Sequence, residues 1–185
     1  MSQSYRDILD EADRHFARAM AEQPQAFQCR LGCTLCCVGL FEIGAADVAV
    51  IASGLSELDP ADRAVIIARA AANVAETDHP DLREAGAAER EEFFERTSDI
   101  PCPALDDRGG CSIYSHRPLV CRTFGVPIRN GEEYLGQECE LNFTSSDPLE
   151  KERAAWDLLW EDAVGPEDEY TVPEAIVLAA RLLRE

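Results

Sequence analysis

The chain has 185 residues, of which 17 are basic and 36 acidic, so its formal net charge is −19. A surface this acidic repels nucleic-acid phosphates and anionic membranes, so neither is expected as a partner. The hydrophobic content of 46% is typical of a globular protein, and the length suits one domain whose core needs no disulfides. The unusual feature is the presence of eight cysteines.

The N-terminal stretch MSQSYRDILDEADRHF is polar and charged, unlike the apolar core of a secretory signal. No run of residues has the length and hydrophobicity of a membrane-spanning helix. We therefore expect a cytoplasmic protein. Clustered cysteines in a reducing compartment are more often metal ligands or catalytic groups than disulfides.

The first half of the chain is expected to be mainly helical. An amphipathic helix over residues 4–23 has apolar residues at spacings of three and four and ends before Pro24. A short strand is expected over 38–43 and a helix over 44–55. The start signal Asp59-Pro60-Ala61-Asp62 predicts a helix over 59–76. The acidic residues 79–97 predict a further, solvated surface helix.

The second half of the chain mixes short strands and helices. A strand is expected over 111–114, one or two helical turns over 117–124, and a hairpin over 126–137 across Asn130-Gly131. A helix beginning at Asp147 is expected to carry three apolar residues, Trp156, Leu159 and Trp160. The last helix begins at the capping box Thr171-Val172-Pro173-Glu174.

These elements predict a mainly α fold, a single compact helical domain over residues 1–185. Short β hairpin and strand pieces are expected around a cysteine-rich metal site. The cysteine-cluster core spans 29–139, flanked by the N-terminal helix 4–23 and by C-terminal helices within 147–185.

The eight cysteines form two groups of four along the chain, and all are candidate metal ligands. The first group is Cys29, Cys33, Cys36 and Cys37; the second is Cys102, Cys111, Cys121 and Cys139. Four thiolates complete one tetrahedral Zn²⁺ site or one iron–sulfur cluster. Cys139, outside the tight spacings, is the weakest candidate.

Cys36 and Cys37 are adjacent, which restricts how they can bind metal. In an extended chain, neighbouring side chains point to opposite sides. We therefore expect these two cysteines to serve two neighbouring sites, or one of them to be a non-ligand. Cys33 and Cys36, by contrast, lie about one turn apart and can point two sulfurs at one ion.

Thiolate ligands favour Zn²⁺, iron–sulfur clusters or Cu⁺ over Mg²⁺ and Ca²⁺, although spacing does not separate zinc from iron. Eight thiolates around two divalent ions leave a net negative charge. Four arginines among the cysteines are candidates to balance it: Arg30, Arg108, Arg117 and Arg122. Arg117 and Arg122 are also candidates for binding an anionic substrate or cofactor. His116, the only histidine within either group of cysteines, is a candidate ligand or proton carrier but is interpreted as a turn residue.

The cysteine segments resemble the bacterial cysteine-cluster proteins of the YkgJ type, which carry a CxxCxxCC signature. The matching segments are Cys29-Arg30-Leu31-Gly32-Cys33-Thr34-Leu35-Cys36-Cys37, Cys102-Pro103-Ala104-Leu105, Gly110-Cys111-Ser112-Ile113-Tyr114, Arg117-Pro118 and Cys121-Arg122. The resemblance implies chelation of zinc or iron. One departure is the first gap, which is three residues here instead of two. Some relatives, such as flagellin lysine methylases, hold a similar cluster inside an enzyme.

Three functions remain open on the sequence, and it does not decide whether the chain is an enzyme. The first is a cysteine-thiolate protein that binds zinc or iron. The second is an iron–sulfur redox enzyme or accessory factor; the pattern Cys29-x3-Cys33-x2-Cys36 also matches radical SAM enzymes, but the alternating strands and helices of a barrel are absent. The third is a thiol redox switch.

Overall fold

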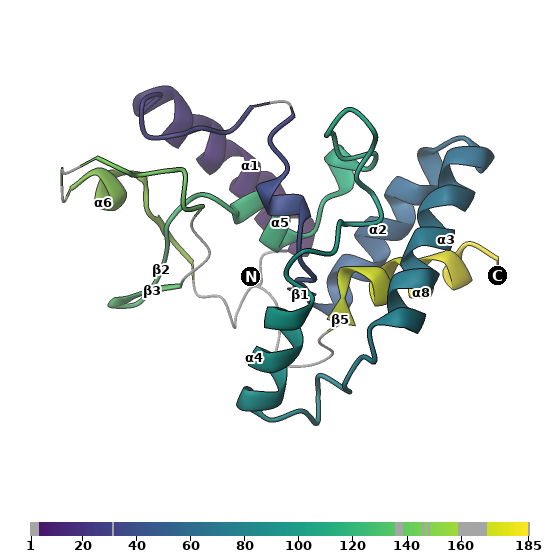
Figure 1. Cartoon of the computed structure of the whole chain (residues 1–185). Coiled ribbons are helices and arrows are strands. Elements are labelled where there is room, and N and C mark those ends of the chain that lie inside the picture. The colour runs from purple at the N-terminus through teal and green to yellow at the C-terminus, as the bar shows by residue number, and fades with distance from the viewer. Residues whose placement is uncertain are drawn as a thin grey trace. The chain divides into compact units, whose positions relative to one another are not determined.

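A computed structural model describes residues 4–30, 32–135, 139–145, 147, 149–158 and 170–184. The chain is mainly helical with a few short strands, as expected (Figure 1). It forms two compact units. Unit 1 is Met1–Cys33 with Leu119–Pro166, and unit 2 is Thr34–Pro118 with Glu167–Glu185. The single domain over residues 1–185 stays a prediction.

Unit 1 begins with helix α1 (Tyr5–Glu22), which confirms the helix expected over 4–23. Ser4 and Asp7 form a reciprocal capping box at its start. The buried face of the helix consists of Ile8, Leu9, Ala12, His15 and Ala19. This face packs on α5 (Leu119–Thr123), the short helix expected within 117–124.

The expected hairpin of unit 1 is present. Strand β2 (Ile128–Asn130) pairs antiparallel with β3 (Glu133–Leu135), and Asn130 pairs with Glu133. The two-residue loop is therefore Gly131-Glu132, one position later than expected, and Gly131 has the positive φ of 69° that such loops favour. Residues 136–137 of the expected hairpin lie outside the described residues.

The helix expected to carry Trp156 is shorter than predicted. Helix α6 (Glu150–Ala154) ends before Trp156, which lies in strand β4 (Trp156–Asp157). This strand pairs in parallel with β2, and the Trp156 N–H donates to Pro127 O at 2.9 Å. Pairing with a distant segment thus prevails over local helix propensity. Leu159 and Trp160 lie outside the described residues.

Three helices form the core of unit 2: α2 (Ala45–Glu57), α3 (Pro60–Glu76) and α8 (Val172–Leu182), with α8 packed against each of the other two. Ile51, Leu55 and Ile176 are fully buried among them. The helices expected over 44–55 and 59–76 are confirmed within two residues. The predicted capping box of α8 is present between Thr171 and Glu174, whereas the Asp59 side chain makes no capping bond to α3.

The prediction of a helix over 79–97 is wrong for residues 79–86, which are not helical. Helix α4 spans only Ala87–Arg96, with Gly86 as its N-cap. Before it, the Asp81 carboxylate accepts the Arg83 N–H at 3.2 Å, a local turn that competes with a helix. The helix is mostly exposed, as expected, but Phe93 is buried and packs against Leu40 and Leu82.

The two strands expected around the cysteines are reduced. Within 38–43 only β1 (Glu42–Ile43) is a strand, and it pairs antiparallel with β5 (Tyr170–Thr171). The strand expected over 111–114 is absent. Cys111 makes one isolated bridge with Leu105, and the chain then turns into the 3₁₀ helix η2 (Tyr114–His116). Among the described residues, none of the helices has the length and apolar character needed to cross a membrane.

Candidate metal centre

Each compact unit holds four of the eight cysteines, and all eight are unbridged. Unit 1 contains Cys29, Cys33, Cys121 and Cys139; unit 2 contains Cys36, Cys37, Cys102 and Cys111. This distribution differs from the order along the chain. Each group of four combines two cysteines from the first cluster with two from the second.

In unit 2, Cys36 and Cys37 lie in the 3₁₀ helix η1 (Leu35–Cys37), and their Sγ atoms are 3.9 Å apart. The expectation that these side chains point to opposite sides is wrong, because it assumed an extended chain. Zn–S bonds of about 2.3 Å at tetrahedral angles place two sulfurs about 3.8 Å apart. The Cys36 and Cys37 sulfurs thus match one edge of such a site.

The backbone brings Cys102 to this pair. The Cys102 N–H donates to Cys37 O at 2.8 Å, and Val38 and Pro101 form an adjacent β bridge. Cys111 lies on the same loop, since its bridge with Leu105 closes the turn that follows Cys102. Hydrogen bonds between main-chain groups therefore connect the segments that carry these cysteines.

Electrostatic interactions link the sulfurs of unit 2. The hydrogen bond from Cys37 lowers the pKa of Cys36 to about 6, assisted by the charge of Arg117. Burial raises the pKa of Cys102, and with the added effect of the nearby Cys111 and Cys36 thiols it reaches about 12. Burial also raises the pKa of Cys111. These thiols are thus close enough to affect one another's ionisation.

Arg117 lies near these thiols, since its charge helps to lower the pKa of Cys36 and offsets part of the rise in the pKa of Cys111. Its guanidinium carbon lies 3.7 Å from the centre of the Tyr114 ring, and Tyr114 itself is 61% exposed. This arrangement suits charge compensation for a group of thiolates. The binding of an anionic cofactor by Arg117 stays a prediction.

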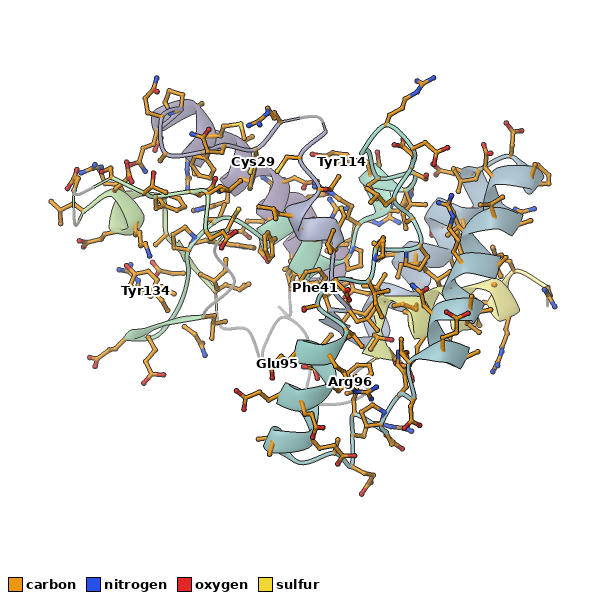
Figure 2. The ribbon with its side chains drawn as sticks, in the orientation of Figure 1. Cys29, Phe41, Glu95, Arg96, Tyr114 and Tyr134 are labelled. Carbon is orange, nitrogen blue, oxygen red and sulfur yellow. The ribbon has the colours of Figure 1, made fainter. Side chains whose placement is uncertain are left out.

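In unit 1, two cysteines distant in sequence meet at Gly125. A Cβ atom at this position would lie 3.8 Å from Cys29 Sγ and 3.7 Å from Cys139 Cβ. Cys29 is exposed (Figure 2), whereas Cys139 is buried. Cys121 lies one turn before Gly125, on α5. Cys33 is partly buried, and its backbone N–H donates to Arg30 O.

Arg122 lies beside Cys121, but its guanidinium forms an ion pair with Asp13 of α1. Its side chain is only 5% exposed. This pair joins α5 to α1, so the structure gives Arg122 a supporting role, and its binding of an anionic cofactor stays a prediction. Of the other arginines, Arg30 donates to Gln28 O and the Arg108 N–H donates to Asp106.

The three histidines have partners other than cysteine. His15 lies between Ala154 O and Arg18. His79 lies between the hydroxyls of Thr77 and Thr171. His116 lies in η2, 3.4 Å from Glu57, which confirms its interpretation as a turn residue.

The sequence model of one protein family matches residues 28–140, which is more than half of the chain. The chain belongs to this family. It is the CxxCxxCC family, described as a putative zinc- or iron-chelating domain, as the resemblance of the cysteine segments implied. No curated protein and no solved structure matches the chain. Membership of the CxxCxxCC family supports metal binding in general.

The CxxCxxCC match contains all eight cysteines with Arg117 and Arg122. Within the part of the chain that the structure describes, no three His, Cys, Asp or Glu side chains are grouped so as to hold a metal ion. Binding of one ion by four thiols would therefore require side-chain movement from the arrangement seen here.

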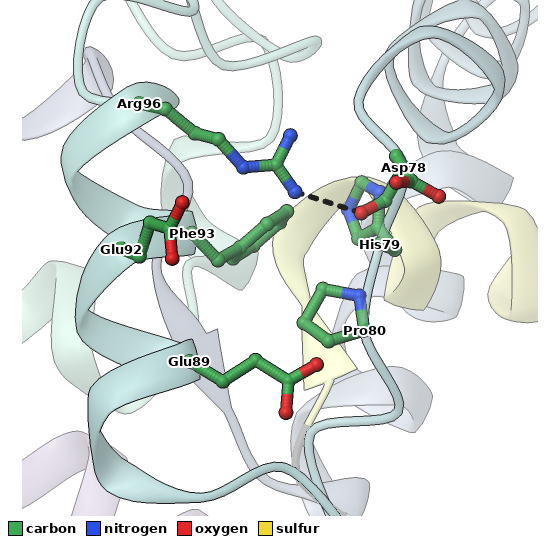
Figure 3. A pocket seen from close by; sticks show the side chains of 7 residues that line it. All are labelled: Asp78, His79, Pro80, Glu89, Glu92, Phe93 and Arg96. Atoms are coloured by element: carbon green, nitrogen blue, oxygen red, sulfur yellow. Dashed lines mark hydrogen bonds between the residues drawn. The ribbon is translucent and has the colours of Figure 1, made fainter.

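A cavity of about 340 Å³ in unit 2 is formed without cysteines (Figure 3). It is lined by Asp78, His79, Pro80, Glu89, Glu92, Phe93 and Arg96. Arg96 donates to Thr77 O and to Asp78 O, each at 2.8 Å, and its guanidinium lies over the Phe93 ring. Phe93 is only 1% exposed, whereas the acidic residues Asp78, Glu89 and Glu92 of the lining are exposed.

Sequence reasoning missed Asn142 and Gly125, which lie beside Cys29 and Cys139. Asn142 is 5% exposed, and its amide reaches Cys29 Sγ at 3.7 Å. Residue 142 lies beyond the matched residues 28–140 of the CxxCxxCC family. A single buried asparagine has no periodicity or spacing that could reveal it. Gly125, in contrast, closely follows α5, the short helix that contains Cys121, and a glycine in this place is typical of a helix end.

Proposed function

We propose that the chain binds zinc or iron through two four-thiolate sites, one in each compact unit. The site in unit 1 uses Cys29, Cys33, Cys121 and Cys139, and the site in unit 2 uses Cys36, Cys37, Cys102 and Cys111. The observation that carries this proposal is the distribution of eight unbridged thiols, four in each unit.

The donor chemistry of unit 2 supports a soft metal. Sulfur ligands favour zinc, iron–sulfur clusters and Cu⁺ over hard cations, and the Cys36 and Cys37 sulfurs are separated by the edge length of a tetrahedral site. Arg117 faces Cys36 and Cys111 and reduces the negative charge that four thiolates leave around a divalent ion.

An iron–sulfur cluster is a finer form of the same proposal, because four thiolates are also the usual ligands of such clusters. The close pair Cys36 and Cys37 favours one further candidate, a thiol switch in which neighbouring thiols are oxidised reversibly. This switch would leave the purified protein without stoichiometric metal.

Elemental analysis of anaerobically purified protein, together with its visible spectrum, tests the proposal. We expect two zinc or iron ions per chain, or iron with sulfide and a brown colour that dithionite bleaches if clusters are present. A chain with neither zinc nor iron, and with paired thiols that lose two hydrogens on oxidation, would contradict metal binding and support the switch.

A further inference from the structure

Asn142 connects the three segments of unit 1 that carry Cys29, Cys121 and Cys139. The backbone N–H of Asn142 donates to Cys139 O at 2.9 Å. Its side-chain Oδ1 accepts the N–H of Gln28, the residue before Cys29, at 2.9 Å. Its Nδ2 donates at 2.9 Å to the carbonyl of Gly125, which lies one turn after Cys121.

The second proton of the Asn142 amide points to a thiol. Nδ2 lies 3.7 Å from Cys29 Sγ, within hydrogen-bond range of sulfur. The orientation of the amide is determined by its two backbone contacts. The N–H of Gln28 can only donate, and the carbonyl of Gly125 can only accept. Both protons of Nδ2 are therefore assigned, one to a carbonyl and one to sulfur.

Gly125 provides the space for this contact. A Cβ atom at Gly125 would lie 2.9 Å from Asn142 Nδ2, too close for an undisturbed amide. The φ angle of Gly125 is +94°, which residues with a side chain rarely adopt. The amide and the glycine thus form one local arrangement beside Cys29.

We propose that Asn142 is the positioning residue of the metal site in unit 1. It holds the segments of Cys29, Cys121 and Cys139 together and donates an N–H···S hydrogen bond to the Cys29 thiolate. Such outer contacts orient metal ligands and withdraw charge from sulfur. This inference rests on the proposed metal-binding function but concerns a residue outside the family match.

The test compares Asn142→Asp with Asn130→Asp in the Co²⁺-loaded full-length protein. Both changes add one negative charge to unit 1, but Asn130 lies in the β2–β3 hairpin. The aspartate at 142 has the same shape, yet it directs an acceptor at Gly125 O and at the Cys29 thiolate. We expect Asn142→Asp to lower the Co²⁺ affinity of one of the two sites at least about tenfold and to shift the thiolate-to-cobalt charge-transfer band of that site.

We expect no such change in Asn130→Asp, nor a further shift when Asn142→Asp is added to Cys29→Ser. If circular dichroism shows that Asn142→Asp does not fold, Asn142→Ser takes its place with the same expectations. An unchanged band and affinity in a folded variant at residue 142 would overturn the inference while leaving the proposed function intact. A wild-type protein that binds no metal would instead overturn the proposed function.

Discussion

The Sγ atoms of Cys36 and Cys37 lie 3.9 Å apart, although the two residues are adjacent in the chain. The 3₁₀ turn η1 makes this possible, because successive side chains of a tight helix diverge by less than those of a strand. The two thiols can therefore bind the same ion. This relationship bears on the proposed ligands, because an extended chain would have directed the two thiols to different sites or left one of them a non-ligand.

The stability of unit 1 should depend on pH through His15. The side chain is 8% exposed, Nε2 donates to Ala154 O, and Nδ1 accepts from Arg18. Burial lowers the pKa of His15 below its ordinary 6.5, since this arrangement requires the neutral ring. Below pH 6.5 the unfolded chain binds a proton that the folded chain does not, so stability falls as the pH decreases toward the lowered folded pKa.

We expect His15 to contribute a loss of at most about 1.4 kcal/mol per pH unit in this window. Urea unfolding of the wild type and of His15→Gln between pH 7.5 and 5.5 measures it. The wild type should lose more stability than the variant as the pH decreases. If the free energy of unfolding had the same pH dependence in the wild type and in His15→Gln, His15 would not be held neutral in the folded chain.

Gly54 should not tolerate a side chain. A Cβ atom on this residue of α2 would lie 2.7 Å from the Cβ of His116 and 3.0 Å from that of Ile113. In a helix, alanine is more favourable than glycine by about 1 kcal/mol. At this position, however, the overlap would push η2 away from α2, which costs more than the propensity gains. We expect Gly54→Ala to lower the free energy of unfolding by about 1–3 kcal/mol, as measured by chemical denaturation.

Gly86→Ala serves as the control for Gly54→Ala, since no atom lies within 4 Å of a Cβ at Gly86. This change should alter stability by less than about 1 kcal/mol. A Gly54→Ala protein as stable as the Gly86→Ala protein would show that η2 can move away from α2 at no cost.

The Asp13–Arg122 pair should stabilise the packing of α1 on α5. Arg122 is almost fully buried, so a neutral residue at position 13 would leave its charge without this partner. Because Asp13 is 45% exposed, water would replace part of the interaction. We expect Asp13→Asn to cost about 1–3 kcal/mol in thermal or urea unfolding.

The matched control for Asp13→Asn is Asp10→Asn, an exposed position of the same helix. This control should change stability by less than about 0.5 kcal/mol. Equal stabilities of the two variants would remove the supporting role of Arg122 and favour its role in binding an anion.

Local signals in the sequence predicted those elements that local contacts determine. The capping box at Thr171 and Glu174 and the apolar stripe of α1 involve residues within one or two turns. The helix expected to reach Trp156 was wrong because this residue pairs with β2, a segment distant in the sequence. Local propensity contains no information about such pairing.

The candidate site was predictable as a set of residues but not as an arrangement. Soft-ligand chemistry and spacing pointed to the eight cysteines. Their division between two units depends on which segments pack together, and chain order does not reveal it. Asn142 illustrates the same limit, since its contacts with Gln28 and Gly125 exist only in the folded chain.

Metal counting by native mass spectrometry on two double variants shows whether each compact unit holds its own metal site. With one site in each unit, Cys36→Ser/Cys102→Ser removes two ligands from the same site, and the protein should keep one ion. Cys102→Ser/Cys121→Ser removes a ligand from each site, and both ions should be lost or weakened. The reverse result, with both ions affected in the first variant and one retained in the second, would rule out one site per unit and favour the grouping of the cysteines by chain order.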